Sequence, residues 1–126
     1  EPGQHGSDML VLDSVPHDYL FQRVAAVIHP GGAGTSAACL RAGVPSVIMP
    51  GFADQFFWAK RLAGLGVAPP PLKWRDLSPK TLADRIALAA FSAPMKKAAR
   101  VASEKICAED GVTRAVTTIE RYVSAA

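Results

Sequence analysis

Short apolar runs alternate with helical segments over the first part of the chain. The apolar runs are typical of buried strands and occupy residues 9–14, 24–29, 45–50 and, more briefly, 67–71. The segments between them are typical of a turn with a short helix at 15–23 and of longer helices at 34–43 and 54–66. Buried strands that alternate with helices predict a parallel sheet covered on both faces.

The rest of the chain is predicted to be wholly helical. Ser78 followed by Pro79 is typical of an N-cap and a first helical residue, and Asp110 is expected to cap the last helix. The last two helices, over 92–110 and 111–123, each carry an apolar stripe, formed by Met95, Ala99, Ala102 and Ile106 and by Val112, Val116, Ile119 and Val123. Stripes with this spacing are typical of packing faces.

Composition limits the function classes. The 126 residues suffice for one domain, and no apolar run reaches the roughly 18 residues of a membrane-spanning helix. The net charge of +3 suits an anionic small ligand and is too scattered to favour nucleic acid. Cys39 and Cys107 fall in separate predicted helices without metal-ligand spacing, which favours reduced thiols in a cytoplasmic protein, with a disulfide as the alternative.

A glycine-rich segment, HPGGAGT at 29–35, follows a predicted strand and opens a predicted helix. Open parallel sheets bind ligands at the carboxyl ends of their strands. Unpaired N–H groups and the helix dipole attract anions there, and glycines allow a phosphate to approach the backbone. The segment therefore predicts a phosphate site, and the alternative is a tight turn that holds no ligand.

The same stretch partly matches a dinucleotide fingerprint. Residues 32–37, GAGTSA, fit G-x-G-x-x-A, and Asp54 lies 20 residues after Gly34. In that fingerprint the acidic residue ends the strand that follows the helix, whereas the corresponding predicted strand ends at Met49 and Pro50. The fingerprint also gives no role to His29. A fragment of an NAD-dependent dehydrogenase is therefore the weaker interpretation.

Several spaced motifs resemble one family. From Ser14 to Val67, including SVPHDYLF, HPGGAGT and ADQFFWAKR, the chain is similar to the C-terminal half of family 1 GT-B glycosyltransferases. The similarity is greatest to sterol glucosyltransferases and bacterial UDP-glycosyltransferases. It implies an α/β fold, a Rossmann-like donor-binding domain. Residues 1–126 would form a single partial domain, truncated at its N-terminal side, with a helical C-terminal segment.

The resemblance also implies a binding site for the diphosphate of a nucleotide sugar. In the family, the histidine before the glycines and the backbone amides of the turn contact the diphosphate. In this sequence these residues are His29, Gly32, Ala33, Gly34 and Thr35. A ring N–H and a threonine hydroxyl are suitable donors to phosphate oxygens.

The sugar and the base are assigned to two other motifs. The family's Asp-Gln pair holds hydroxyls of the donor sugar, which implies Asp54 and Gln55 here. Taken without the other motifs, Asp54 would be an N-cap. The loop that binds the nucleotide base corresponds to 14–17, where Val15 offers its backbone and His17 stands where many relatives have glutamine.

The resemblance implies an inverting hexosyltransferase that needs no metal and no cofactor beyond its donor, UDP-glucose. The acceptor is a lipid, sterol or other small-molecule hydroxyl. We expect no catalytic residue in this chain, because the base belongs to a missing N-terminal acceptor domain. A non-catalytic nucleotide-sugar-binding subunit with a partner chain is the alternative. Missing strands leave an edge open to self-association, and the parent enzyme is expected to associate peripherally with a membrane.

Overall fold

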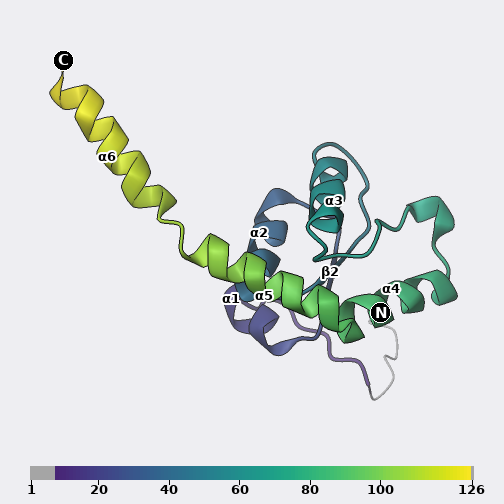
Figure 1. The fold of residues 1–126 in the computed structure, drawn as a ribbon. Coiled ribbons are helices and arrows are strands. Elements are labelled where there is room, and N and C mark those ends of the chain that lie inside the picture. Colours follow the sequence, from purple (N-terminus) through teal and green to yellow (C-terminus); the bar gives the residue numbers. More distant parts are fainter. Residues whose placement is uncertain (1–7, 126) are drawn as a thin grey trace.

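The computed structural model describes residues 8–125 and is α/β, with helices predominating (Figure 1). Its elements in chain order are α1 (His17–Leu20), the 3₁₀ turn η1 (Phe21–Arg23), β1 (Val27–His29), α2 (Ala33–Ala42), β2 (Ser46–Ile48), α3 (Gln55–Gly64), the 3₁₀ turn η2 (Trp74–Asp76), α4 (Pro79–Phe91), α5 (Ala93–Cys107) and α6 (Gly111–Ser124). The predicted order of strands and helices from β1 to α6 is confirmed, apart from the strand predicted at 67–71.

The sheet consists of β1 and β2, which run parallel with Ile28 opposite Val47. All three residues of β2 are buried, as expected for a strand covered on both faces. Ile28 in β1 is 47% exposed, so β1 is covered less completely. The parallel register places the last residues of the two strands, His29 and Ile48, opposite one another. The segments that follow the strands therefore leave the sheet at the same end.

The predicted strand at 9–14 is wrong. This segment is irregular, and the four apolar side chains Met9, Leu10, Val11 and Leu12 are between 50% and 79% exposed. Within residues 8–125 the sheet has only two strands, and neither pairs with this segment. An apolar run becomes a strand only when a neighbouring strand takes up its backbone hydrogen bonds.

The predicted strand at 67–71 forms only in part. The Ser46 amide donates to the Val67 carbonyl at 3.1 Å, and the Leu72 amide donates to the Ile48 carbonyl at 3.0 Å. The segment between these contacts therefore runs beside β2. Its three consecutive prolines, residues 69–71, have no N–H to donate, so a regular ladder cannot form.

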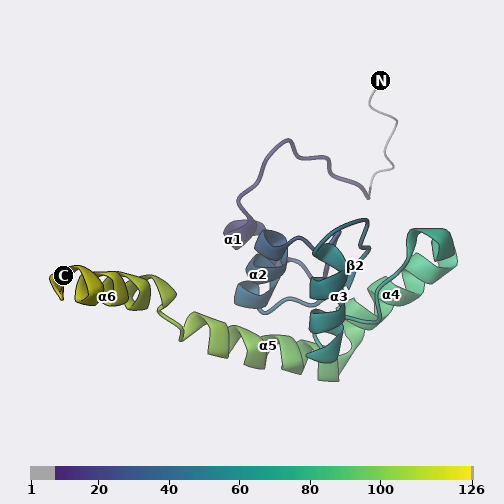
Figure 2. The ribbon, with the colours of Figure 1, turned by 90° about the horizontal axis from the view of Figure 1, so that it is seen from above.

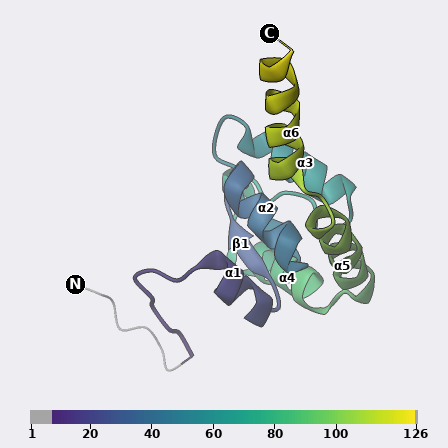
Figure 3. The ribbon, with the colours of Figure 1, turned by 90° about the vertical axis from the view of Figure 1, so that its left-hand side faces the viewer.

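Two apolar clusters hold the helices against the strands. The first joins β2, α3 and α5 through Ile48, Leu62 and Ala99, with Trp58 packed against it. The second joins α1, η1 and α2 through Phe21, Cys39 and Val44. Figure 3 shows α2 and α5 beside one another. Cys39 and Cys107 lie in these two helices, as predicted, and both are free thiols.

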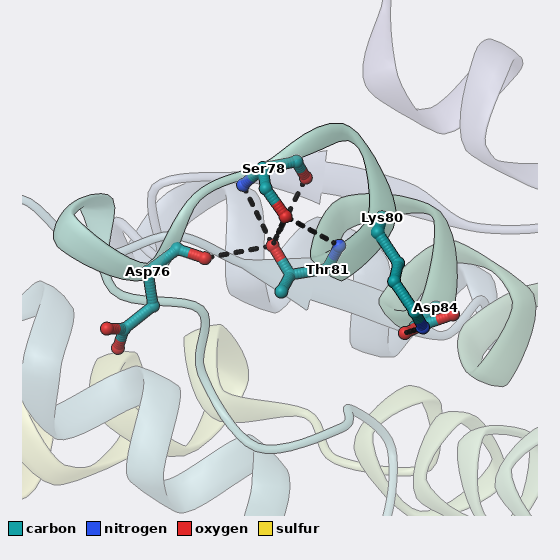
Figure 4. A network of polar contacts seen from close by, with 5 residues as sticks. All are labelled: Asp76, Ser78, Lys80, Thr81 and Asp84. Carbon is teal, nitrogen blue, oxygen red and sulfur yellow. Dashed lines mark hydrogen bonds and ion pairs between the residues drawn. The ribbon is translucent and has the colours of Figure 1, made fainter.

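The start of α4 confirms the predicted N-cap. The Ser78 hydroxyl accepts from the Thr81 amide at 3.1 Å, and the Thr81 hydroxyl accepts from the Ser78 amide at 2.9 Å. This reciprocal pair satisfies two backbone donors at the helix start. Figure 4 shows the network, which includes the Asp76 carbonyl and the nearby Lys80–Asp84 ion pair at 2.8 Å.

The final helix, α6, projects away from the rest of the chain (Figures 1 and 2). Asp110 caps it as predicted by accepting from the Thr113 amide at 3.1 Å. Its apolar stripe is not a packing face in this structure, because Val112, Val116, Ile119 and Val123 are 47% to 78% exposed. Among the described residues, no helix is both long and apolar enough to cross a membrane.

Candidate functional site

The segments that follow β1 and β2 are in direct contact. A Cβ atom added to Gly31 would lie 2.8 Å from Cγ2 of Ile48 and 3.2 Å from the carbonyl oxygen of Gln55. Gly31 also has a φ of +96°, a conformation that other residues rarely adopt. The glycine turn therefore packs against the start of α3, which brings the His29 motif and the Asp54–Gln55 pair to one end of the sheet.

His29 ends β1 and is buried, with only 6% of its surface exposed. Its Nδ1 accepts a hydrogen bond of 3.0 Å from the Gly31 amide, so Nε2 carries the proton of the neutral ring. Burial, and secondarily the nearby His17, lower the pKa of His29 to about 4. Among residues 8–125, the buried Nε2 atom has no hydrogen-bond partner. His29 therefore offers one neutral, unpaired donor.

The N-terminus of α2 lacks a side-chain cap. Its N-cap residue is Gly32, which has no side chain, and Ala33, Gly34 and Thr35 form the first turn. The amides of a first turn have no partner within their own helix. The helices α4, α5 and α6 satisfy one such amide with a serine or aspartate side chain. The start of α2 is thus a set of unpaired donors at the positive end of a helix dipole.

An open cavity of about 780 Å³ lies along α2 and brings three predicted site residues together, namely His17, Gly34 and Thr35. A smaller hollow of about 370 Å³ shares His17 and is also lined by Val15. His17 begins α1, and its ring stacks on Phe21 with centroids 4.6 Å apart. Neither cavity is lined by Asp54 or Gln55, so the two groups of predicted residues occupy different parts of this end of the sheet.

Asp54 precedes α3 in the N-cap position, but its carboxylate does not cap the helix. One carboxylate oxygen, Oδ2, accepts instead from the indole Nε1–H of Trp58 at 3.1 Å. The preceding Ala53 has a φ of +52°, an uncommon conformation for a residue with a side chain. The simple N-cap interpretation of Asp54 is therefore wrong, and its exposed carboxylate remains open to a ligand.

Gln55, in contrast, is 9% exposed and shapes the loop that precedes it. Its Oε1 accepts from the amides of Gly51 at 2.8 Å and Phe52 at 3.2 Å. Backbone amides can only donate, so these two bonds identify which end of the side chain faces the loop. The NH₂ group of Gln55 remains as a hydrogen-bond donor.

Sequence reasoning missed two residues of this region, Gly31 and Trp58. Gly31 was part of the recognised glycine motif, but only the packing shows that its amide sets the protonated nitrogen of His29. Trp58 lies four residues after Asp54, a spacing that places two side chains on one helix face. Within residues 8–125, no group of three or more potential metal-ligating side chains lies together.

Parallel strands joined through a glycine turn and a helix are typical of the Rossmann-like α/β class of domains. Residues 6–120 match the family described as "Erythromycin biosynthesis protein CIII-like, C-terminal domain". The chain belongs to this family of C-terminal domains of GT-B glycosyltransferases, which confirms the resemblance found in the sequence.

Characterised relatives are sterol glucosyltransferases. The chain is 43% identical over 112 residues to the "Sterol 3-beta-glucosyltransferase" of Saccharomyces cerevisiae (strain YJM789), an alignment that covers 89% of this chain and 9% of the relative. It is 40% identical over 116 residues to "Sterol 3-beta-glucosyltransferase UGT80A2" of Arabidopsis thaliana, covering 92% and 18%. The chain thus spans less than a fifth of the length of these two relatives.

Solved structures of glycosyltransferases have the same fold. The structure of "glycosyltransferase VinC in complex with DTDP" matches with a TM-score of 0.89 and 29% identity, over 98% of this chain and 31% of that one. The "Glycotransferase of kitacinnamycin" matches with a TM-score of 0.88 and 26% identity, over 96% and 31%. Both relatives are transferases, and the chain corresponds to about a third of each.

Proposed function

We propose that this chain is the donor-binding part of a UDP-sugar-dependent glycosyltransferase, with UDP-glucose as the donor. The observation that carries the proposal is the coincidence of an uncapped helix start at Gly32 with the buried, unpaired Nε2–H of His29. A diphosphate would satisfy both with the oxygens of one ligand. Leaving a buried donor unpaired costs about 1–3 kcal/mol, so such a donor calls for a partner.

The remaining predicted residues have consistent roles in this proposal. The turn amides and the Thr35 hydroxyl hold the diphosphate, and the loop with Val15 and His17 holds the base. Asp54 and Gln55 hold hydroxyls of the sugar. The name of the VinC structure includes a nucleoside diphosphate, dTDP, and the sterol relatives are named glucosyltransferases, which supports a nucleotide-sugar donor.

The acceptor and the catalytic base belong, in this proposal, to an N-terminal domain that lies outside this chain. The family name describes a C-terminal domain, and each relative is much longer than this chain. The parent enzyme transfers a hexose to a lipid, sterol or other small-molecule hydroxyl without a metal ion, in a reaction that inverts the anomeric carbon. The free thiols of Cys39 and Cys107 suit the reducing cytoplasm, from which the enzyme would reach a membrane peripherally.

The first test addresses the diphosphate. His29→Ala should weaken the binding of UDP by about 1.5–3 kcal/mol, the range for a hydrogen bond to a charged group. Because Nε2 is covered, its bond to a phosphate requires a small movement of the covering atoms on binding. Isothermal calorimetry with UDP measures the affinity. His29→Gln is the matched variant, because its amide can supply a donor near the position of Nε2 and should recover part of the loss.

Equal affinity of His29→Ala and the parent for UDP would show that the ring only supports the turn. The same calorimetry with dTDP-glucose and NAD tests the nucleotide. The proposal expects UDP-glucose to bind more tightly than either. Preferential binding of NAD would instead favour the dehydrogenase interpretation.

The second test separates sugar from nucleotide. Asp54→Ala should lower the affinity for UDP-glucose by about 1.5–3 kcal/mol, because it removes a charged acceptor from a sugar hydroxyl. The affinity for UDP should stay nearly unchanged, since the carboxylate accepts from Trp58 and not from the turn. Calorimetry with both ligands measures the difference. Equal losses for both ligands would contradict a sugar-specific role for Asp54.

A further inference from the structure

The Asp54 carboxylate owes its orientation to a side chain outside the recognised motif. The indole of Trp58 is half-buried and packs against the cluster that contains Ile48 and Leu62. Its Nε1–H donates to Oδ2 of Asp54 at 3.1 Å, and the Trp58 amide donates to the Asp54 carbonyl at 3.1 Å. The side chain is thus anchored in the core at one end and bonded to the carboxylate at the other.

Oδ2 of Asp54 accepts from Trp58, whereas the second carboxylate oxygen, Oδ1, accepts no hydrogen bond from the described residues. Gln55 is constrained in a complementary way, because Oε1 is occupied by two loop amides and only its NH₂ group is available. The adjacent side chains therefore present one acceptor and one donor. This arrangement matches a sugar hydroxyl that donates to Asp54 and a neighbouring sugar oxygen that accepts from Gln55.

We propose that Trp58 is a positioning residue for the donor sugar, which fixes Asp54 through its indole N–H so that Oδ1 faces the ligand. The proposal rests on the proposed function, since it assigns the sugar to Asp54 and Gln55. It adds a residue whose contribution is transmitted through Asp54 and not through direct contact. Packing alone would not require the N–H group, because a phenyl ring also fills an apolar site.

The substitution Trp58→Phe removes the N–H and keeps an aromatic ring in the cluster. We expect the affinity for UDP-glucose to fall about 3- to 10-fold, the effect of losing one hydrogen bond of modest strength, while the affinity for UDP stays within about 2-fold. Tyr122→Phe removes the polar hydrogen of an exposed aromatic side chain on α6, outside the site, and should leave both affinities unchanged. Calorimetry on the full chain measures all of these values.

A double-mutant cycle distinguishes positioning from packing. In an Asp54→Ala background, Trp58→Phe should have no further effect on the affinity for UDP-glucose, because the residue through which it acts is gone. A loss of the same size in both backgrounds would overturn the proposal. A parallel loss of UDP affinity in Trp58→Phe alone would also overturn it, since it would indicate general damage to the site.

A ligand-free measurement keeps this inference separable from the proposed function. In a ¹H–¹⁵N spectrum, Asp54→Ala should shift the indole resonance of Trp58 more strongly than that of Trp74. An unchanged Trp58 resonance would show that the hydrogen bond is absent in solution and would overturn the inference. If the shift occurs but the parent chain binds neither UDP-glucose nor UDP, the proposed function is wrong, whereas the hydrogen bond between Asp54 and Trp58 is confirmed.

Discussion

Gly31→Ala is expected to lower the free energy of unfolding by about 2–5 kcal/mol, combining overpacking of about 1–3 kcal/mol with backbone strain of about 1–2 kcal/mol. The new Cβ would lie 2.8 Å from Cγ2 of Ile48 and 3.2 Å from the Gln55 carbonyl oxygen. Ile48 belongs to the buried core cluster and the Gln55 carbonyl to the backbone of α3, so neither can move away without disturbing the packing. The residue also needs a φ of +96°.

Urea denaturation followed by circular dichroism measures this loss. Gly64→Ala is the matched control, because a Cβ at this α3 position meets no atom within 4 Å. Alanine is favoured over glycine in a helix, so the control should gain up to about 1 kcal/mol. Equal stability of Gly31→Ala and the parent would show that the turn does not pack against α3 in solution.

Acidification should destabilise the folded chain through His29 by up to about 3 kcal/mol, the free energy that corresponds to its shift from 6.5 to about 4. Burial lowers the pKa of the folded ring, so below pH 6.5 the unfolded chain takes up a proton that the folded chain does not. Stability from this residue is therefore complete above pH 6.5, falls as the pH decreases and levels off below about pH 4.

His29→Asn provides the comparison, because its carbonyl oxygen can still accept from the Gly31 amide while the titrating ring is gone. Urea denaturation of both proteins between pH 7.5 and pH 4 isolates the His29 contribution, since every other titrating group is shared. The parent should lose more stability than the variant over this interval. Parallel losses would mean that His29 is not a buried neutral ring.

The proposed diphosphate site depends on the Gly31 turn and on the neutral ring of His29 together. The Gly31 amide holds Nδ1, burial keeps the ring neutral, and Nε2–H is therefore a donor across the physiological pH range. A donor that carries no charge still bonds to a phosphate oxygen, while the positive end of α2 supplies the electrostatic attraction. Diphosphate binding through His29 thus requires no protonation step.

Local chemistry was sufficient to predict several elements. Ser78 with Pro79 and Asp110 begin their helices as predicted, because a cap involves residues only three positions apart. Gly43 ends α2 with a φ of +67°, a backbone conformation that favours glycine at this position. The alternation of apolar runs and helices also predicted the parallel pairing of β1 and β2, because a strand–helix–strand unit has few other ways to bury both strands.

Other features depended on partners distant in the sequence. The apolar run at 9–14 has the composition of a strand, but no neighbouring strand pairs with it in the described chain. The apolar stripe on α6 is exposed and does not pack against the core of the described chain. Periodicity determines which face of an element is apolar, and only the tertiary structure decides what covers that face.

The candidate site divides in the same way. The sequence by itself determined the residue types and their order, from His29 and its glycines to the Asp54–Gln55 pair, because those motifs are continuous. Only the tertiary structure decided that His29 is buried and neutral, that the Asp54 carboxylate accepts from the Trp58 indole and not from the first-turn amides of α3, and that Gly31 packs against Gln55. Burial arises where separate segments meet, and even the bond between Asp54 and Trp58, four residues apart, depends on how the indole packs against the core. A local sequence pattern does not contain that information.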